Sequence, residues 1–212
     1  QPEVTRKLAF AHAQAGRDTD AAREYTRLAG PPGDEALQRD ALLQAAELYA
    51  QAGRSGDAVE LLERYLVRYP QPAGEAAAVM QRLAAIEAAS GDTQRHRHGL
   101  KALVRLDATA GDPVTREPAA QASLALADYR IAEFTQLPLG EPLQQRLADK
   151  LEAMELAVGA LEAAAGYGIT AVTTAATHRT GQLYQDLGHA LLASSRPPGL
   201  GPGELARYEL LL

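Results

Sequence analysis

The chain has 212 residues and a net charge of −6, and it carries 44 Ala and 31 Leu against only 3 Ile and 8 Val. Ala and Leu are strong helix formers and the β-branched residues that fill strands are scarce, so the composition excludes a large sheet. The absence of Cys excludes disulfides, thiol catalysis and cysteine-ligated zinc. No basic stripe accompanies the acidic charge, so no nucleic-acid partner is expected.

Three segments in the first half of the chain follow one plan. Each contains a Gly between two runs that are long enough for a helix and in which apolar residues recur at helical spacing. These glycines are Gly16, Gly53 and Gly91, which are separated by 37 and 38 residues. Gly readily adopts the left-handed conformation that ends a helix, and the next helix then begins after a short turn. The pattern therefore predicts three helical hairpins, at about residues 2–33, 39–70 and 77–108 of a first domain that covers residues 1–110.

The second of these hairpins resembles the tetratricopeptide repeat (TPR), a helix–turn–helix unit of about 34 residues. The residues that carry the resemblance are Leu42, Ala45, Ala46, Tyr49, Gly53, Ala58, Leu62, Tyr65 and Pro70. The other two hairpins depart from the pattern. His12 in the first and Glu87 in the third occupy the position that is usually aromatic, and His96 in the third occupies a position that usually holds a small residue. The resemblance implies an all-α, right-handed α-solenoid that binds proteins.

Two local expectations follow from this alignment. The period is longer than that of the family, so the loops between hairpins should be extended. His12 takes an aromatic packing position, and we expect it to be partly buried and hydrogen-bonded.

Longer helices are expected after residue 110. The apolar spacing predicts helices over about 117–136, 142–165 and 169–194, with Pro142 in the first turn of the second. These helices form a region of long helical hairpins, residues 111–195, that continues the array. The buried stripe of the second helix is expected to consist of Leu143, Leu147, Leu151, Met154 and Val158.

The last residues are divided by a Pro- and Gly-rich stretch. Residues 196–203 are interpreted as a linker, and residues 204–212 as the start of a truncated helix. The chain begins at Gln1 without an initiator Met and ends on an apolar run, which favours a fragment of a larger TPR protein. No run reaches the ~20 apolar residues of a membrane span, so no direct membrane insertion is expected.

The second half also resembles the tails of large bacterial envelope TPR proteins, in the segments Tyr129–Phe134 and Ala176–Leu187. Some relatives of that kind accompany energised transport or gliding machineries. The compartment itself is unknown from the sequence, and this resemblance favours a periplasmic or envelope-associated location over a cytoplasmic one.

No group of residues has the spacing that catalysis or metal binding needs. His96 and His98 are two residues apart and point in different directions on a helix. His178 and His189 return to nearly the same helix face but lie about 16 Å apart along it, too far for one metal ion. The Gly-rich stretches at 166–168 and 199–203 follow no strand and do not make phosphate loops. We therefore expect no catalytic, cofactor or metal site, and no enzyme.

In the TPR family the first helix of each repeat lines a concave groove. Carried over by position, this groove presents the candidate protein-binding residues Arg6, Phe10, Gln14, Leu43, Glu47, Gln51 and Gln81, with Ala85 and Ala88 beside the last. The set lacks the cluster of Lys and Arg that clamps an acidic peptide tail, so a partner helix or peptide segment fits better. The alternative is that the groove is filled by the long helices of the chain or by a neighbouring repeat.

Three functional hypotheses remain open. The leading one is a protein-interaction scaffold or adaptor that binds a partner in this groove. The alternative is a structural or assembly subunit of a bacterial envelope transport or motility complex, which predicts oligomers formed through the apolar ends. The remote alternative is an all-helical enzyme.

Overall fold

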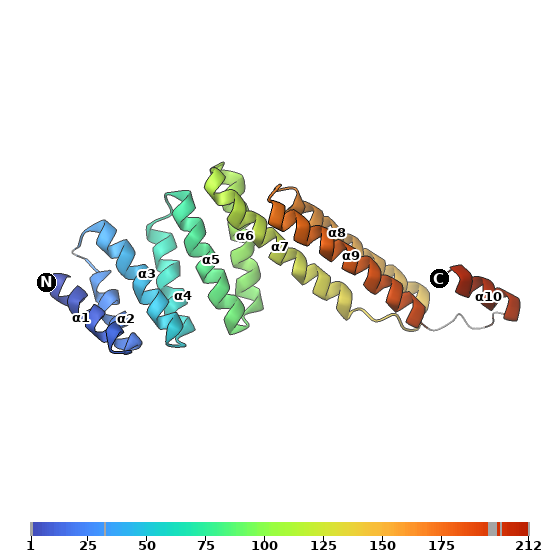
Figure 1. Cartoon of the computed structure of the whole chain (residues 1–212), viewed down its shortest axis with the longest axis horizontal. Coiled ribbons are helices and arrows are strands. Elements are labelled where there is room, and N and C mark those ends of the chain that lie inside the picture. The colour runs from blue at the N-terminus through green and yellow to red at the C-terminus, as the bar shows by residue number, and fades with distance from the viewer. Residues whose placement is uncertain (1, 32, 195–198, 200, 212) are drawn as a thin grey trace. The chain divides into compact units, whose positions relative to one another are not determined.

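The computed structural model describes residues 2–31, 33–194, 199 and 201–211, and every regular element in this part of the chain is a helix (Figure 1). The expectation of an all-α chain is thus confirmed. The helices are α1 (Pro2–Gln14), α2 (Asp18–Leu28), α3 (Glu35–Gln51), α4 (Ser55–Arg68), α5 (Ala73–Ser90), α6 (Thr93–Ala110), α7 (Pro113–Gln136), α8 (Leu143–Ala165), α9 (Thr170–Ala193) and α10 (Pro202–Leu211).

The chain divides into two compact units, residues 1–118 and 119–212. The division falls inside α7, at Pro118, which has no N–H to donate to the carbonyl one turn earlier. Helix α7 begins at Pro113, earlier than the expected start at 117. Asp112 explains this early start, because its side chain accepts a hydrogen bond from the Val114 N–H at 2.9 Å.

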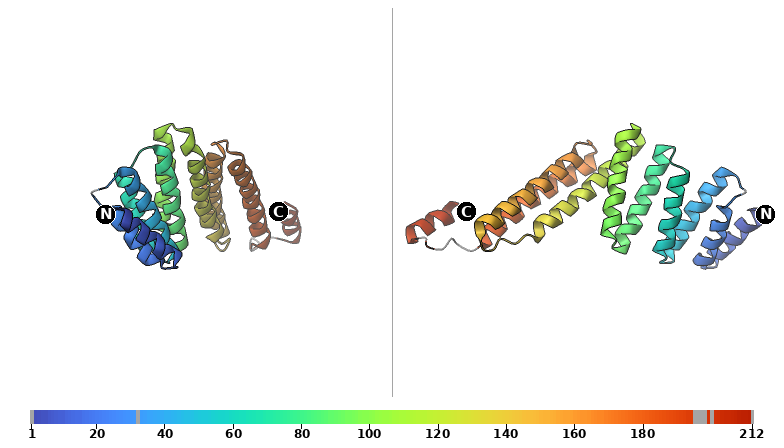
Figure 2. Two further views of the ribbon diagram at one scale, coloured as in Figure 1. Left: turned by 60° about the vertical axis from the view of Figure 1, so that its left-hand side comes forward. Right: turned by 180° about the vertical axis from the view of Figure 1, so that it is seen from behind.

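Unit 1 consists of the hairpins α1–α2, α3–α4 and α5–α6, which follow one another along the unit (Figure 2). Each hairpin turns at a Gly with a positive φ, and these are Gly16 (67°), Gly53 (73°) and Gly91 (76°). In the second turn, the Arg54 N–H donates to the Tyr49 carbonyl at 2.8 Å, which satisfies a carbonyl at the helix end. The glycines therefore close the hairpins as the sequence predicts.

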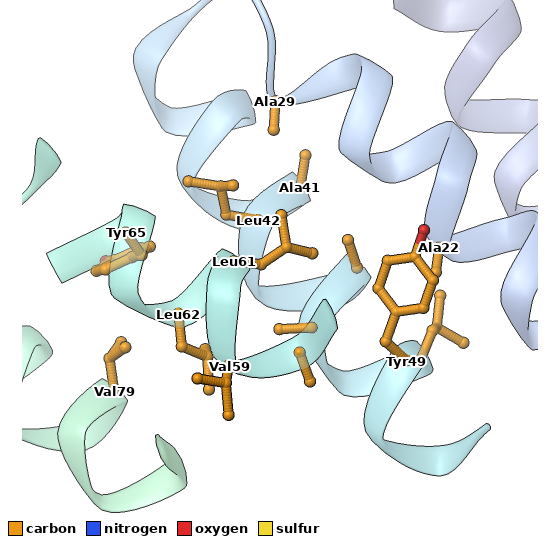
Figure 3. Packing of buried hydrophobic residues seen from close by; sticks show 14 of the residues in the cluster. Ala22, Ala29, Ala41, Leu42, Tyr49, Val59, Leu61, Leu62, Tyr65 and Val79 are labelled. Atoms are coloured by element: carbon orange, nitrogen blue, oxygen red, sulfur yellow. The ribbon is translucent and has the colours of Figure 1, made fainter. Parts of the chain in front are cut away.

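The core of unit 1 is built from small and large side chains that alternate between neighbouring helices. Ala22, Ala45 and Ala58 are fully buried, and so is Leu42. Figure 3 shows the ring of Tyr49 beside Ala22 of α2. The Ala residues allow the helices to approach closely, and the Leu and Tyr side chains fill the space between them.

The loop between α2 and α3 is fixed by side chains from α3 and α4. Gln38 is 2% exposed and donates from Nε2 to the Gly30 carbonyl at 3.1 Å. Arg68 donates to Gln38 Oε1, and Arg64 and Arg68 both donate to the Ala29 carbonyl, at 3.3 and 3.4 Å. This loop, residues 29–34, is thus held by polar contacts between two hairpins. The expectation of extended loops is wrong for the next connection, because only residues 69–72 separate α4 from α5 and the longer period is taken up by longer helices.

Unit 2 is built on the part of α7 after residue 118 together with α8 and α9. Its main buried cluster includes Phe134 of α7, Leu161 of α8 and Leu183 of α9, each at most 1% exposed. A second set, Ala120, Ala164 and Val172, draws on the same helices. This core is made of residues of unit 2 alone.

The expected stripe of α8 is wrong in part. Leu151 is 46% exposed, whereas the buried residues of this helix are Lys150, Met154, Ala157, Leu161 and Ala164. Lys150 is buried because its ammonium donates to the carbonyls of Phe134 and Leu137, at 3.0 and 2.8 Å. These carbonyls lie at the C-terminal end of α7, where a cation is stabilised by the helix dipole.

The ends of the later helices also differ from expectation. Pro142 is the residue before α8 and has an extended ψ of 124°, so it does not belong to the first turn. Helix α10 begins at Pro202 and not near Glu204. Of the expected linker, residues 196–198 and 200 lie outside the described residues. In the described part of the chain, no helix is long and apolar enough to cross a membrane.

Candidate protein-interaction surface

The sides of α1, α3 and α5 that carry the seven candidate residues make up the surface that the sequence singles out, and we call it the first-helix face. Arg6, Phe10, Gln14, Glu47 and Gln51 are exposed, and Leu43 and Gln81 are half-buried. On α1 and α3 the candidates repeat at intervals of four, which keeps them on one side of each helix, and α5 contributes Gln81 alone.

Phe10 is the most distinctive member of the first-helix face. Its side chain is 59% exposed, which is unusual for an aromatic residue of this size, and the chain has only two Phe. Large rings that remain outside a core are frequent anchors in protein interfaces. The flanking Arg6 and Gln14 provide polar groups for hydrogen bonds at its edges.

A shallow groove of about 380 Å³ lies on the first-helix face between α3 and α5, and we call it the α3/α5 groove. Leu43 is the only candidate residue that lines it. The other lining residues are Ala36, Arg39 and Asp40 of α3, Tyr65 of α4, and Glu75, Ala78 and Arg82 of α5. The structure thus brings Leu43 together with charged residues of two neighbouring hairpins.

Arg39 organises the polar side of this groove. Its guanidinium lies 2.8 Å from Glu35 Oε1 and 3.2 Å from Glu75 Oε2, so it joins α3 to α5. It also stacks 4.5 Å from the centre of the Tyr69 ring. The hydrogen bond with Glu35 is the main reason that the pKa of Arg39 is raised. Arg39 therefore stays charged and positions two carboxylates.

Tyr65 closes the floor of the α3/α5 groove. It is 2% exposed, and its hydroxyl donates to Glu75 Oε2 at 3.3 Å. Burial is the main cause that raises the pKa of this phenol, and the Glu75 carboxylate adds to the effect. The groove floor is thus a neutral hydroxyl that already has an acceptor.

Sequence reasoning missed Arg39, Asp40, Glu75 and Arg82. The signal was present, because Asp40 and Arg39 precede Leu43 by three and four residues and so share its side of α3. The prediction extended the row toward the end of α3 and not toward its start.

His178 and His189 are both exposed, and the described residues contain no group of three or more His, Asp or Glu that could hold a metal ion. His12 is half-buried as expected. Its Nδ1 is buried and has no hydrogen-bond partner among the described residues, so the expected hydrogen bond is wrong for this atom.

No family model matches the chain, and no curated protein matches it in sequence. One similar solved structure is a variant of a Podospora anserina protein, which is described as a putative kinesin light chain with nearly identical TPR-like repeats. The match has a TM-score of 0.50 and 18% sequence identity, and it covers 88% of this chain and 86% of that chain. A further structure of that protein gives a TM-score of 0.47 at 18% identity, covering 89% of each chain.

A Bacteroides ovatus protein described as protein-binding gives a TM-score of 0.47 at 10% identity, covering 88% of this chain and 98% of that one. The match with a TM-score of 0.50 shows the fold. The chain is an all-α solenoid of TPR-like helical hairpins, which confirms the resemblance and the fold class predicted from the sequence.

Proposed function

We propose that this chain is a protein-interaction scaffold, and that a helix or extended segment of its partner binds along the first-helix face. The observation that carries the proposal is the exposure of one row of side chains across α1 and α3, with Phe10 at 59%. A TPR-like fold supports a role in protein binding.

The chemistry of the face favours a mixed apolar and polar segment as the partner. Phe10 and Leu43 offer apolar contact, and Gln14 and Gln51 offer amide groups for hydrogen bonds to a peptide backbone. Two cations line the α3/α5 groove, and one of them, Arg39, pairs with both Glu35 and Glu75. The other, Arg82, does not by itself make the cluster of Lys and Arg that clamps a strongly acidic tail.

Affinity capture with matched variants tests the proposal. A chain with Phe10→Ala and Glu47→Ala should recover its specific partners at least about tenfold less well than the unchanged chain, because truncation of one central aromatic anchor costs about 2 kcal/mol. Helicity by circular dichroism should not change, since both side chains are exposed.

Val67→Ala is the control, because Val67 is 85% exposed but lies on α4, away from the first-helix face. Equal recovery of the same partners by the double variant and by the control would show that partners bind elsewhere. The envelope-complex alternative, the compartment and the absence of enzymatic activity stay predictions.

A further inference from the structure

A second and larger groove, of about 890 Å³, is lined by residues of α4, α5 and α6, and we call it the α4/α6 groove. Its apolar lining comes from Leu66 of α4, Met80 and Leu83 of α5, and Ala102 of α6. Leu83 is buried, whereas Leu66, Met80 and Ala102 are half-buried and keep surface that a ligand can cover. The groove therefore offers apolar area from three helices to one ligand.

The basic side chains of the groove all come from the first half of α6. They are Arg95, Arg97, His98 and Lys101. From residue 93 to residue 106 this helix contains no Asp or Glu, although the whole chain has a net charge of −6. The N-terminus of a helix carries a positive partial charge of its own, so the helix dipole and these cations favour an anion together.

The acidic side chains of the groove gather around one of these cations or lie out of reach. The Asp92 carboxylate accepts a hydrogen bond from the Arg95 N–H at 3.0 Å and lies 3.6 Å from its guanidinium. Glu63 lies 3.9 Å from the same guanidinium. Glu87 is 4% exposed, and a Cβ atom at Gly99 would lie 3.2 Å from its Oε2, so α6 covers this carboxylate. The acids are thus engaged at the Arg95 end of the groove.

Lys101 is a cation of the groove that has no acidic partner among the described residues. Its side chain is exposed, and it lies two turns of α6 beyond Arg95. Arg97 and Arg105 stand four residues away on either side, and like charges at this spacing repel each other. A carboxylate bound at Lys101 relieves this repulsion. The next residue, Ala102, belongs to the apolar lining, so one ligand can use both.

We propose that the α4/α6 groove binds a segment of a partner protein in which an Asp or Glu is flanked by apolar residues. The carboxylate accepts a hydrogen bond from the Lys101 ammonium, and the apolar neighbours pack on Leu66 and Met80. A nucleic acid fits less well, because its phosphates gain nothing from the apolar lining and are repelled by the acidic end of the groove. The site is separate from the first-helix face and does not rest on the proposed function.

The test uses the full chain and two fluorescein-labelled peptides of Leu and Ser that differ in one central residue. One peptide carries Glu and the other carries Gln, which has nearly the same shape without the charge. By fluorescence anisotropy, the Glu peptide should bind about threefold more tightly, as expected for one exposed ion pair.

Lys101→Gln should bring the affinities of the two peptides together. Arg105→Gln is the matched control, because Arg105 is an exposed cation one turn further along α6 that does not line the groove. This variant removes the same charge from the same helix and should preserve the preference for Glu.

The two methionines of the chain locate the binding without any substitution. Met80 lines the groove, and Met154 is 5% exposed in the core of unit 2. With ¹³C-labelled methionine methyl groups, the Met80 resonance should shift when the Glu peptide is added, and the Met154 resonance should stay in place.

Equal affinity of the unchanged chain for both peptides, or a preference for Glu that survives in Lys101→Gln, would overturn the proposal. A Met80 resonance that stays in place at saturation, or no saturable binding of the Glu peptide up to millimolar concentration, would also overturn it. So would complete displacement of the Glu peptide by a single-stranded oligonucleotide or by phosphatidylglycerol vesicles, since the cations would then take phosphate groups and not a protein segment.

Discussion

Glu87 shows how one residue can conflict with the fold that surrounds it. It stands where the TPR resemblance places an aromatic side chain, and it is almost fully buried in unit 1. Burial is the main cause that raises the pKa of its carboxyl group, although Arg95 opposes the effect. The folded protein therefore favours the neutral form of Glu87 more than the unfolded chain does.

This conflict predicts a dependence of stability on pH. A carboxyl group with a raised pKa in the folded state favours folding at pH values below its unfolded pKa, and this contribution is lost as the pH rises through the folded pKa. Glu87→Gln should therefore raise the melting temperature near pH 7 by about 2–4 °C, which corresponds to about 1 kcal/mol. The difference should disappear toward pH 4.

Thermal melts followed by circular dichroism between pH 4 and pH 8 measure this effect. Glu47→Gln is the matched control for the substitution itself, since Glu47 is an exposed residue of the same unit. A Glu87→Gln chain that is less stable at pH 7 than the unchanged chain would show that the ionised carboxylate has an internal partner.

At the scale of elements, each hairpin depends on a single residue in its turn. Gly53 has a φ of 73°, a conformation that residues with a Cβ atom rarely adopt. No atom lies within 4 Å of the place where its Cβ would be, so the constraint is conformational and not steric crowding by neighbours. The same is true of Gly16 and Gly91.

Gly53→Ala should therefore destabilise the chain by about 1 kcal/mol, because the alanine must adopt the left-handed conformation. Gly56→Ala is a matched control three residues later. Gly56 lies in the first turn of α4 with a negative φ and free space around it, so alanine should be neutral or stabilise the helix by up to about 1 kcal/mol. Urea unfolding curves measure both, and equal effects of the two substitutions would contradict the assigned role of the turn.

At the scale of the whole molecule, the two units each have a buried cluster of their own. Leu62 is 2% exposed in the core of unit 1, and Phe134 is fully buried in the core of unit 2. None of the residues in the described cluster around Leu62 comes from unit 2. The two described clusters therefore draw on different halves of the chain.

Truncation of either residue to Ala should cost about 2–5 kcal/mol, because it leaves a cavity in a close-packed core. The loss of protection should be local. In hydrogen exchange followed by mass spectrometry, Phe134→Ala should speed exchange in α8 and α9, and Leu62→Ala should speed it in α3 and α4. If Phe134→Ala accelerated exchange in α3 and α4 as much as in α8 and α9, the prediction of separate cores would be contradicted.

The sequence by itself determined the helices, the hairpin turns and the exposed row of the first-helix face. Helix propensity and the left-handed preference of Gly act between near neighbours in the chain, so they can be read without knowing the fold. The placement of Phe10, Glu47 and Gln51 on one side of their helices follows from helical periodicity and from the TPR resemblance. The binding role of these residues stays a prediction.

Only the tertiary structure decided which face of a helix is buried when the sequence allows more than one. Lys150 is buried in place of Leu151 because the end of α7 supplies two carbonyls to its ammonium. Glu87 and Gly99 are twelve residues apart, yet they meet because α5 and α6 pack as a hairpin. Burial and electrostatic environment are set by the neighbouring helix, and the periodicity of one helix carries no information about that partner.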